Sequence, residues 1–178
     1  SVTSGENHSC ALLANGTAMC WGRGDRGQLG NGQSGASYTS PTPVAVAGLS
    51  DLQYLNAGDR HTCGVRSTGS IVCWGDNTYG QLGDGSRIDR STPVRVDGLT
   101  NIVRVEAFGF HTVALDSAGT VWTWGRNNLG QVGDGTGVER TSPVSVALPP
   151  ISAIGSGRDY AMAAESDGTI WAWGRNDS

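Results

Sequence analysis

The chain has 178 residues, a formal net charge of −4 and a pI near 5.2, and it contains 28 glycines but no lysine. The acidic balance argues against nucleic-acid binding, which normally requires a clustered basic face. Without lysine there is no Schiff-base nucleophile and no phosphate-loop lysine. No apolar run approaches the roughly 20 residues that a membrane-spanning helix needs.

The first predicted elements are a short strand at Val2–Gly5 and a β-hairpin at His8–Gly22. Short apolar and β-branched runs flank the turn Ala14-Asn15-Gly16, and glycine in third place is typical of a three-residue loop that ends in a left-handed residue. A glycine-rich loop follows at 27–32. The last strand, Pro43–Val46, begins with a proline, as an edge strand allows. The unit therefore predicts four short strands.

The same succession returns three times along the chain. Further inner strands are predicted at Leu52–Gly58, Ile102–Ala107 and Ile151–Gly157, hairpins at His61–Gly75, His111–Gly125 and Tyr160–Gly174, and outer strands at Pro93–Val96 and Pro143–Val146. A period of about 50 residues with four short strands per unit is typical of β-propeller blades. We expect one all-β repeat array, 1–178, with antiparallel four-stranded blades at about 1–47, 48–97, 98–147 and 148–178.

The last predicted blade lacks its outer strand, so about 3.75 blades are expected. This number does not readily close into a ring, because propellers have about four to eight blades. An open array would leave unpaired edges and exposed blade faces, which natural proteins avoid. The sequence therefore predicts either a piece of a longer chain or copies that associate with one another.

The register of the first two hairpins predicts two disulfides. The turns place Cys10 directly opposite Cys20 and Cys63 opposite Cys73. Both pairs fall at non-hydrogen-bonded sites of the ladder, where the Cα separation of about 4.5 Å lies within disulfide range. Zinc is disfavoured, because the spacing within each pair does not match a short zinc knuckle. Disulfides predict an oxidising compartment, so the chain is expected to be secreted or on a cell surface.

The repeated pattern A-G-x-x-H-[ST]-x-A-L-x-x-x-G-x-[VI]-x-x-W-G-x-N-x-x-G-Q-L-G-[DN]-G, followed by a Pro-Val strand, resembles the regulator of chromosome condensation repeat family. The resemblance covers essentially the whole chain, with Trp-Gly and G-Q-L-G-[DN]-G at matching offsets in successive units. It implies a β-propeller, which has seven blades in the best-known members. The cysteine form, H-[ST]-C-x(9)-C-W-G, is similar to secreted bacterial members.

The histidines and the Trp-Gly tryptophans recur at fixed repeat offsets, which indicates structural roles. We expect the histidines to cap a strand or to hydrogen-bond a neighbouring blade, and the tryptophans to pack between blades. The histidines are His8, His61 and His111, and the tryptophans are Trp21, Trp74, Trp124 and Trp173.

The sequence predicts no cofactor, no metal site and no catalytic residue. The glycine-rich loops lack the strand-to-helix context and the lysine of a phosphate loop. One carboxylate per loop, such as Asp84 or Asp134, is thin ligation for calcium. No acid stands at a fixed offset from the histidines, and no non-repeated acid–base set suits a hydrolase.

Partner binding is expected where the loops between the first and second strands vary in charge and size. The candidate residues are Glu6, Asn7, Asp59, Arg60, Phe110, Arg158 and Asp159. Repetition places these loops on one rim, and arginine and exposed aromatic side chains are typical of binding hot spots. A second, arginine-rich patch is expected on the other connections, at Arg23, Arg26, Tyr79, Arg87, Arg90, Arg126 and Arg140.

These features favour a non-enzymatic, extracellular or cell-surface interaction module that binds a protein or a glycan. The family resemblance implies two alternatives, guanine-nucleotide exchange on a small GTPase and inhibition of a secreted enzyme. The acidic chain, the paired cysteines and the lack of a wedge-like inserted hairpin disfavour the exchange factor. A hydrolase is the alternative from another class.

Overall fold

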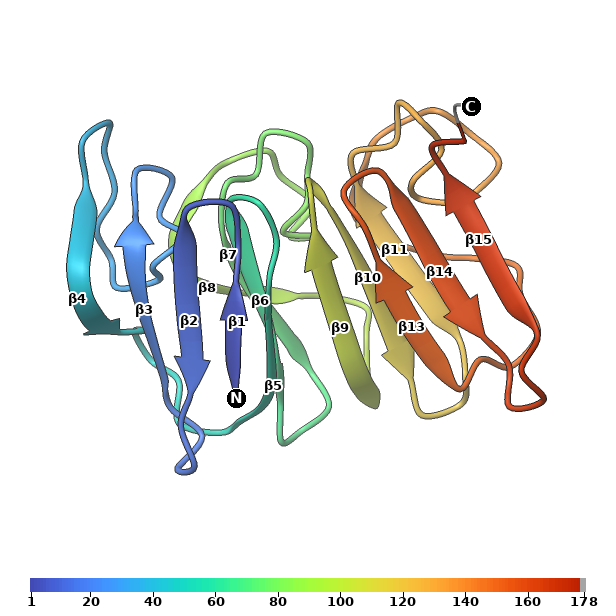
Figure 1. The fold of residues 1–178 in the computed structure, drawn as a ribbon, viewed down its shortest axis with the longest axis horizontal. Coiled ribbons are helices and arrows are strands. Elements are labelled where there is room, and N and C mark those ends of the chain that lie inside the picture. The colour runs from blue at the N-terminus through green and yellow to red at the C-terminus, as the bar shows by residue number, and fades with distance from the viewer. Residues whose placement is uncertain (177–178) are drawn as a thin grey trace.

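The computed structural model describes residues 1–176, which form fifteen strands in four antiparallel sheets (Figure 1). The sheets contain β1 (Val2–Ser4), β2 (His8–Leu12), β3 (Ala18–Arg23) and β4 (Thr39–Ala45); β5 (Leu52–Ala57), β6 (His61–Arg66), β7 (Ile71–Gly75) and β8 (Arg90–Val96); β9 (Ile102–Phe108), β10 (His111–Asp116), β11 (Val121–Gly125) and β12 (Arg140–Ser145); and β13 (Ala153–Ser156), β14 (Tyr160–Ala164) and β15 (Ile170–Gly174). The described residues include no helix that could cross a membrane.

Strands follow chain order within each sheet, and the sheets stand side by side in chain order as an arc of propeller blades. The first strands of neighbouring sheets, β1, β5, β9 and β13, contact one another in succession along the arc. The first and fourth sheets lie at opposite ends of the arc (Figure 1). The predicted all-β partial propeller is confirmed. The predicted fourth unit extends to Ser178, and its last two residues lie outside the described range.

The predicted hairpin register is confirmed by the turn geometry. Leu13 N donates to Thr17 O (2.9 Å), and Gly16 lies between them with a φ of +78°. Cys10 consequently pairs with Cys20 across the ladder, with a Cα separation of 4.1 Å, and the two sulfurs form a disulfide. Cys63 and Cys73 form the equivalent disulfide in the second sheet, also with a Cα separation of 4.1 Å.

The outer strands begin before the predicted prolines, so this part of the prediction is wrong. They start at Thr39, Arg90 and Arg140. In the second sheet Cys73 pairs with Val94, whereas Gly75 already pairs with Arg90, so Pro93 lies within a bulge of the outer strand. The other two outer strands shift register at the equivalent place. An edge strand accommodates proline at a bulge because the ladder needs no N–H there.

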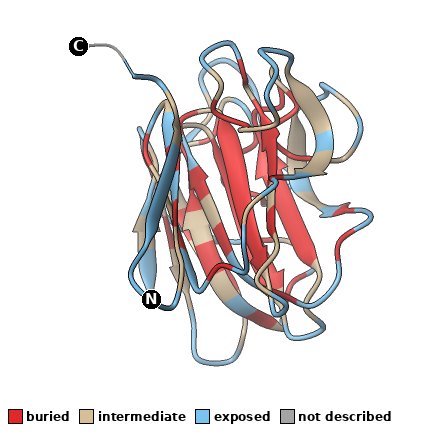
Figure 2. Cartoon of the chain, turned by 90° about the vertical axis from the view of Figure 1, so that its right-hand side faces the viewer, coloured by how far each residue is buried: buried red, intermediate tan, exposed pale blue. Residues whose placement is uncertain are grey.

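The core lies at the junctions between sheets, where it forms three clusters of buried apolar side chains. Figure 2 shows buried residues concentrated on the strands and exposed ones on the connections. At the junction of the first and second sheets, Leu29 of the glycine-rich loop and Trp74 are fully buried beside the Cys10–Cys20 disulfide. Leu82 and Trp124 repeat this arrangement at the next junction. Each sheet is therefore stabilised mainly by its neighbours.

A repeated set of hydrogen bonds, which we call the clasp, crosses the junctions. At the first junction His8 Nε2 lies 2.9 Å from Thr62 Oγ1, and this hydroxyl donates to the carbonyl oxygen of Gln28 (3.3 Å). The indole nitrogen of Trp74 donates to the same carbonyl (3.0 Å). Because the hydroxyl proton is given to Gln28, the threonine oxygen accepts from the Nε2–H of His8.

The second junction repeats the clasp and the third keeps only part of it. His61, Thr112, Gln81 and Trp124 form the second clasp, with distances of 3.0, 2.9 and 2.8 Å. At the third junction Trp173 Nε1 donates to the carbonyl of Gln131 (2.9 Å), but Ala161 takes the place of the threonine. Within residues 1–176, neither ring nitrogen of the buried His111 has a partner in hydrogen-bond geometry.

Close packing at the clasp explains the last glycine of the G-Q-L-G sequence. A Cβ on Gly30 would lie 2.7 Å from Trp74 Nε1, and a Cβ on Gly83 would lie 2.7 Å from Trp124 Nε1. Both glycines also have a positive φ, of +69° and +73°. Glycine is therefore required on two counts, by backbone conformation and by the indole of the next sheet.

Candidate interaction surface

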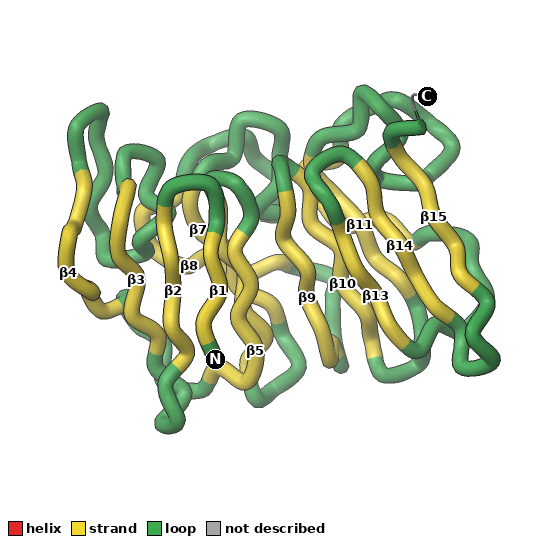
Figure 3. Tube along the Cα trace, viewed as in Figure 1, coloured by secondary structure: helices red, strands yellow, loops and turns green. Residues whose placement is uncertain are grey.

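The connections that follow the first and third strands of each sheet emerge at the same end of the molecule (Figures 1 and 3). They are residues 5–7, 24–38, 58–60, 76–89, 109–110, 126–139 and 157–159, and we call this end the loop face. The inner loops and the second, arginine-rich patch that the sequence predicted on the other connections therefore lie at the same end of the molecule. Alternate strands of an antiparallel sheet run in opposite directions, so both kinds of connection reach one end.

Backbone hydrogen bonds join successive inner loops of the loop face. Glu6 N donates to Asp59 O and Asp59 N donates to Gly109 O, both at 3.1 Å. These bonds link the first, second and third sheets. The loops are therefore held at fixed positions relative to one another, as a rigid binding surface requires.

Ion pairs also connect the loops of different sheets. Arg60 Nε lies 3.3 Å from Glu6 Oε2, which joins the second sheet to the first. Arg158 Nε lies 3.3 Å from Asp59 Oδ2, so the fourth sheet reaches the second. Gly109 occupies the intervening loop and has no side chain to obstruct this contact. Four of the predicted partner-binding residues are thus brought together on the inner rim.

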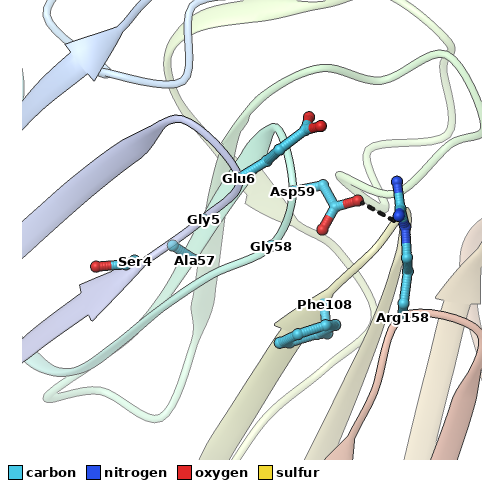
Figure 4. Close-up of a pocket in the computed structure, with 8 residues that line it drawn as sticks. All are labelled: Ser4, Gly5, Glu6, Ala57, Gly58, Asp59, Phe108 and Arg158. Carbon is cyan, nitrogen blue, oxygen red and sulfur yellow. Dashed lines mark ion pairs between the residues drawn. The ribbon is translucent and has the colours of Figure 1, made fainter.

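A pocket of about 260 Å³ opens beside the Arg158–Asp59 pair (Figure 4). Its lining comes from the ends of the first strands and the loops after them, and comprises Ser4, Gly5, Glu6, Ala57, Gly58, Asp59, Phe108 and Arg158. The carboxylate of Asp59 and the guanidinium of Arg158 meet on one side, with the ring of Phe108 below them in this view. The pocket therefore combines charged groups with an aromatic surface.

The carboxyl group of Asp59 is incompletely compensated in this setting. Burial raises its pKa above the ordinary value, and the charges of Glu6 and Asp159 act in the same direction, against the nearby arginines 158 and 60. Asp59 Oδ2 is buried and makes no hydrogen bond within the described residues, because the contact with Arg158 lacks hydrogen-bond geometry. A further donor at this oxygen would be favourable.

Phe110 and Asp159 belong to a second cluster on the same face. The rings of Phe110 and Tyr79 meet edge to face with centroids 5.4 Å apart, and the guanidinium of Arg126 lies 5.4 Å from the Tyr79 centroid. Asp159 lies 3.9 Å from Arg126 and 3.7 Å from Arg175. Phe110, predicted as an exposed aromatic, is half-buried by these contacts. The cluster joins the predicted rim to the predicted arginine patch.

The arginines of the predicted second patch are paired with carboxylates. The pairs are Arg23–Asp25, Arg26–Asp89, Arg87–Glu139, Arg90–Asp84, Arg126–Asp159 and Arg140–Asp134. Arg26–Asp89 and Arg87–Glu139 connect neighbouring sheets. The carboxylates neutralise the guanidinium charges, so the loop face is mixed in charge and not a basic patch.

The loop that follows the third strand of the first sheet, residues 24–38, differs from its counterparts in the second and third sheets. Tyr38 packs its ring against Gly24, and its hydroxyl accepts from Asn31 Nδ2 (2.7 Å). In the second sheet Asn77 takes the place of Gly24 and donates to Asp84 Oδ1 (3.0 Å). Asn7, the last predicted partner-binding residue, is exposed and lines a hollow beside Tyr38.

The three histidines are placed at the sheet junctions and not on the loop face. Burial lowers the pKa of His8 and of His111 to about 4. Burial, together with the other two histidines, lowers the pKa of His61 to about 3. All three are buried between sheets, and the neutral imidazoles of His8 and His61 donate to a threonine of the next sheet, so these side chains contribute to packing and are inaccessible to a substrate.

Phe108 is a pocket residue that was not among the predicted partner-binding residues. It departs from the repeat pattern, because the other units have Gly5, Gly58 and Gly157 at this position. That departure was the available signal. The sequence does not show that Phe108 lines a pocket, because the pocket forms only where the arc brings the ends of three inner strands together.

Comparison with known sequences identifies the repeat. The profile of the regulator of chromosome condensation (RCC1) repeat matches residues 15–65, 68–115 and 118–164, and a second profile of this repeat matches 1–28, 54–81 and 102–131. Human E3 ubiquitin-protein ligase HERC2 is 38% identical over 88 residues, which cover 47% of this chain and 2% of the ligase.

Comparison with solved structures identifies the same architecture. Human WBSCR16 superposes with a TM-score of 0.88 at 18% identity, over 97% of this chain and 46% of that protein. Yeast RCC1 (Prp20), solved bound to Kap60, superposes with a TM-score of 0.84 at 23% identity, over 98% and 43% of the two chains. The chain therefore spans less than half the length of each of these proteins.

Proposed function

Because the chain belongs to the regulator of chromosome condensation repeat family, we propose that it is a non-enzymatic module that binds a protein partner through the loop face. One observation carries the proposal. The hairpins repeat in all four sheets and a tryptophan of the later sheet bonds the glutamine carbonyl at all three junctions, whereas the inner loops carry Glu6-Asn7, Asp59-Arg60, Gly109-Phe110 and Arg158-Asp159 in turn. A constant frame that presents varied, mutually bonded loops suits recognition of a partner.

A protein partner is favoured over a glycan by the mixture of charges on this face. Charged groups of both signs lie within the same inner rim, as in Glu6–Arg60 and Asp59–Arg158. Protein surfaces offer complementary charges of both signs, whereas neutral glycans do not. Yeast RCC1 (Prp20), with which this chain shares its fold, was solved bound to Kap60.

An extracellular or cell-surface location is part of the proposal. Both cysteine pairs are fully buried and joined at the centre of their hairpins. Disulfides persist in oxidising compartments and are rare in the cytosol. Two buried structural disulfides therefore favour a chain that works outside the cytoplasm.

The placement of the histidines supports a non-enzymatic role. His8 and His61 are buried in clasps, with their Nε2 atoms engaged by Thr62 and Thr112. A general acid or base needs a pKa near the working pH and access to the substrate. Burial removes both properties from these side chains.

The test is a binding screen followed by mapping of the face. The purified protein is screened against extracellular proteins and glycans, and the affinity of any ligand is measured for Glu6→Lys and Asp97→Lys. Each acid pairs with one arginine, but only Glu6 lies on the loop face. We expect Glu6→Lys to weaken protein binding at least about tenfold and Asp97→Lys to leave it unchanged. Binding of glycans alone, or equal effects of the two variants, would overturn the proposal.

A further inference from the structure

The pocket beside Phe108 arises from two neighbouring departures from the repeat pattern. In the second sheet Gly58 precedes the loop, and a Cβ there would lie 2.4 Å from the ring of His61. The third sheet has Phe108 at this position, and its side chain is 43% exposed and lines the pocket. Gly109 follows with a φ of +52°, and a Cβ there would lie 2.1 Å from the backbone oxygen of Arg158, so only glycine leaves room for Arg158 beside it.

The charged lining of the pocket favours a cation. Glu6 and Asp59 supply two carboxylates to the lining, whereas Arg158 supplies one guanidinium. The charges of Glu6 and Asp159 act on Asp59 in one direction and those of Arg158 and Arg60 in the other, and Asp59 Oδ2 is the buried acceptor that this balance leaves without a hydrogen bond. The whole chain carries a net charge of −4, so basic partners are attracted at long range.

Arg158 occupies this cation position loosely. Its side chain is 66% exposed and approaches Asp59 Oδ2 at 3.3 Å without hydrogen-bond geometry. Only the arginine of this pair is exposed, because the side chain of Asp59 is 12% exposed and its carboxylate still needs a cation beside it. A cation from outside can replace Arg158 and keep the charge of Asp59 compensated, and it gains a hydrogen bond that Arg158 does not make.

We propose that this pocket binds a lysine or arginine side chain of the protein partner. The cation lies between Glu6 and Asp59 in place of Arg158, and the aliphatic stem packs on the ring of Phe108. This inference rests on the proposed function and specifies the chemistry of the partner. Aromatic faces attract cations, and long basic side chains bury their stems against apolar surface. An anionic group would meet the carboxylates of Glu6 and Asp59 and be repelled.

The test uses short capped peptides as probes of the pocket. Acetyl-Gly-Arg-Gly-amide and acetyl-Gly-Lys-Gly-amide are titrated into the full chain labelled with ¹⁵N, and the amide shifts of Gly58 and Phe108 are followed. The citrulline peptide, which keeps the shape of arginine without its charge, and the glutamate peptide are the controls. We expect saturable shifts with the two basic peptides alone.

Variants of the residues that line the pocket should change the affinity for the basic peptides in opposite directions. Asp59→Asn should weaken binding of the basic peptides about tenfold or more, because it removes a charged acceptor. Phe108→Ala should also weaken them, and it alters a partly exposed side chain in case Asp59→Asn disturbs folding. Arg158→Gln should tighten binding, since it removes the internal competitor. Arg95→Gln is the matched control, because Arg95 is 65% exposed and pairs with Asp97 away from the loop face.

Two results would overturn the inference. If Arg158→Gln weakened binding and the glutamate peptide bound instead, the pocket would be an anion site. If neither basic peptide bound, the pocket would have no cation specificity. In both cases the loss of partner affinity in Glu6→Lys would still test the proposed function separately.

Discussion

Each repeat histidine is a neutral side chain enclosed between two sheets, and this has a consequence for stability against pH. The unfolded chain protonates its histidines near pH 6.5, whereas the folded chain resists protonation down to about pH 4 for His8 and His111 and about pH 3 for His61. The unfolded state therefore binds more protons between these limits. The histidines consequently stabilise the fold fully above pH 6.5 and lose that contribution as the pH falls.

We expect the free energy of unfolding to decrease between pH 7 and pH 5 by about 2 kcal/mol for each buried histidine. Denaturant titrations at several pH values measure this slope, and His61→Gln should reduce it by about one third. Carboxylates such as Asp84, whose pKa is lowered by hydrogen bonds and Arg90, lose their contribution only at lower pH. A stability that stays constant from pH 7 to pH 5 would contradict the assignment.

The threonine of the clasp tests the hydrogen bonds themselves. Thr112→Val keeps the shape of the side chain but leaves His61 Nε2–H and the carbonyl of Gln81 without the hydroxyl, so it should destabilise the protein by about 1–3 kcal/mol. Ala161→Ser is the reciprocal change, because it offers His111 an acceptor and should stabilise by about 1 kcal/mol. Chemical unfolding measures both. If Thr112→Val left the free energy of unfolding unchanged, packing alone would hold the junction.

At the scale of the element, the glycine-rich loop allows backbone strain to be separated from crowding. Gly83 and Gly98 have nearly the same φ, +73° and +81°, but only a Cβ on Gly83 would contact a neighbour, Trp124 Nε1, at 2.7 Å. Both substitutions to alanine carry the cost of a left-handed residue, about 1–2 kcal/mol. Gly83→Ala should cost at least about 1 kcal/mol more. If thermal unfolding showed the same loss of stability for Gly83→Ala and Gly98→Ala, crowding against the Trp124 indole would not explain the glycine.

The disulfides belong to the same scale, since each joins the two strands of one hairpin. In the chain-entropy model each contributes on the order of 3 kcal/mol. Intact mass spectrometry before and after reduction should show the gain of four hydrogens for two bonds. Free thiols at Cys10 or Cys63 in unreduced protein would contradict both the pairing and the proposed oxidising location.

Local rules predicted the elements well where one residue fixes the geometry. The third glycine of each turn defined the hairpin register, and through it the facing cysteines. Proline predicted the start of the outer strands less well, because a bulge allows the strand to begin at Arg90, before Pro93. A bond from the histidine to the neighbouring sheet was predicted, as His8 and Thr62 make it, but the central acceptor of the clasp could not be, since it is the backbone carbonyl of Gln28, a group that every residue possesses.

The candidate site was predicted only in part for a related reason. Glu6, Asp59 and Arg158 were selected from sequence, but the contact between Asp59 and Arg158 passes over an intervening sheet. Such a contact depends on the curvature of the whole arc and leaves no signal at any fixed sequence spacing. The predicted arginine-rich patch is not a basic surface. Each guanidinium there is paired with a carboxylate from its own loop or from the neighbouring loop.

At the scale of the whole molecule, the outer face of the fourth sheet presents exposed apolar side chains. Tyr160 and Met162 of β14 and Ile170 of β15 lie on this face, and Ala153, Ile154 and Ala164 surround a hollow between them. Association would remove this surface from water. The isolated chain 1–178 should therefore form concentration-dependent oligomers.

Light scattering across a concentration series checks this prediction with a matched pair of variants. Ile170 and Ile88 are both 62% exposed, but Ile88 lies on the loop face. Ile170→Glu should shift the chain toward monomer, whereas Ile88→Glu should not. A compact monomer at every concentration, or equal effects of the two variants, would refute association through the fourth sheet.

The clasp gives the array a polarity. Its histidine and glutamine carbonyl come from the earlier sheet, and its threonine and tryptophan come from the later one, as His8 and Gln28 meet Thr62 and Trp74. A unit that carries all four groups is complementary to a copy of itself. Tandem duplication of the second unit, which has His61, Thr62, Trp74 and Gln81, would therefore create a new junction with every bond already satisfied. A single repeat therefore carries both halves of the clasp through which it can join a further copy.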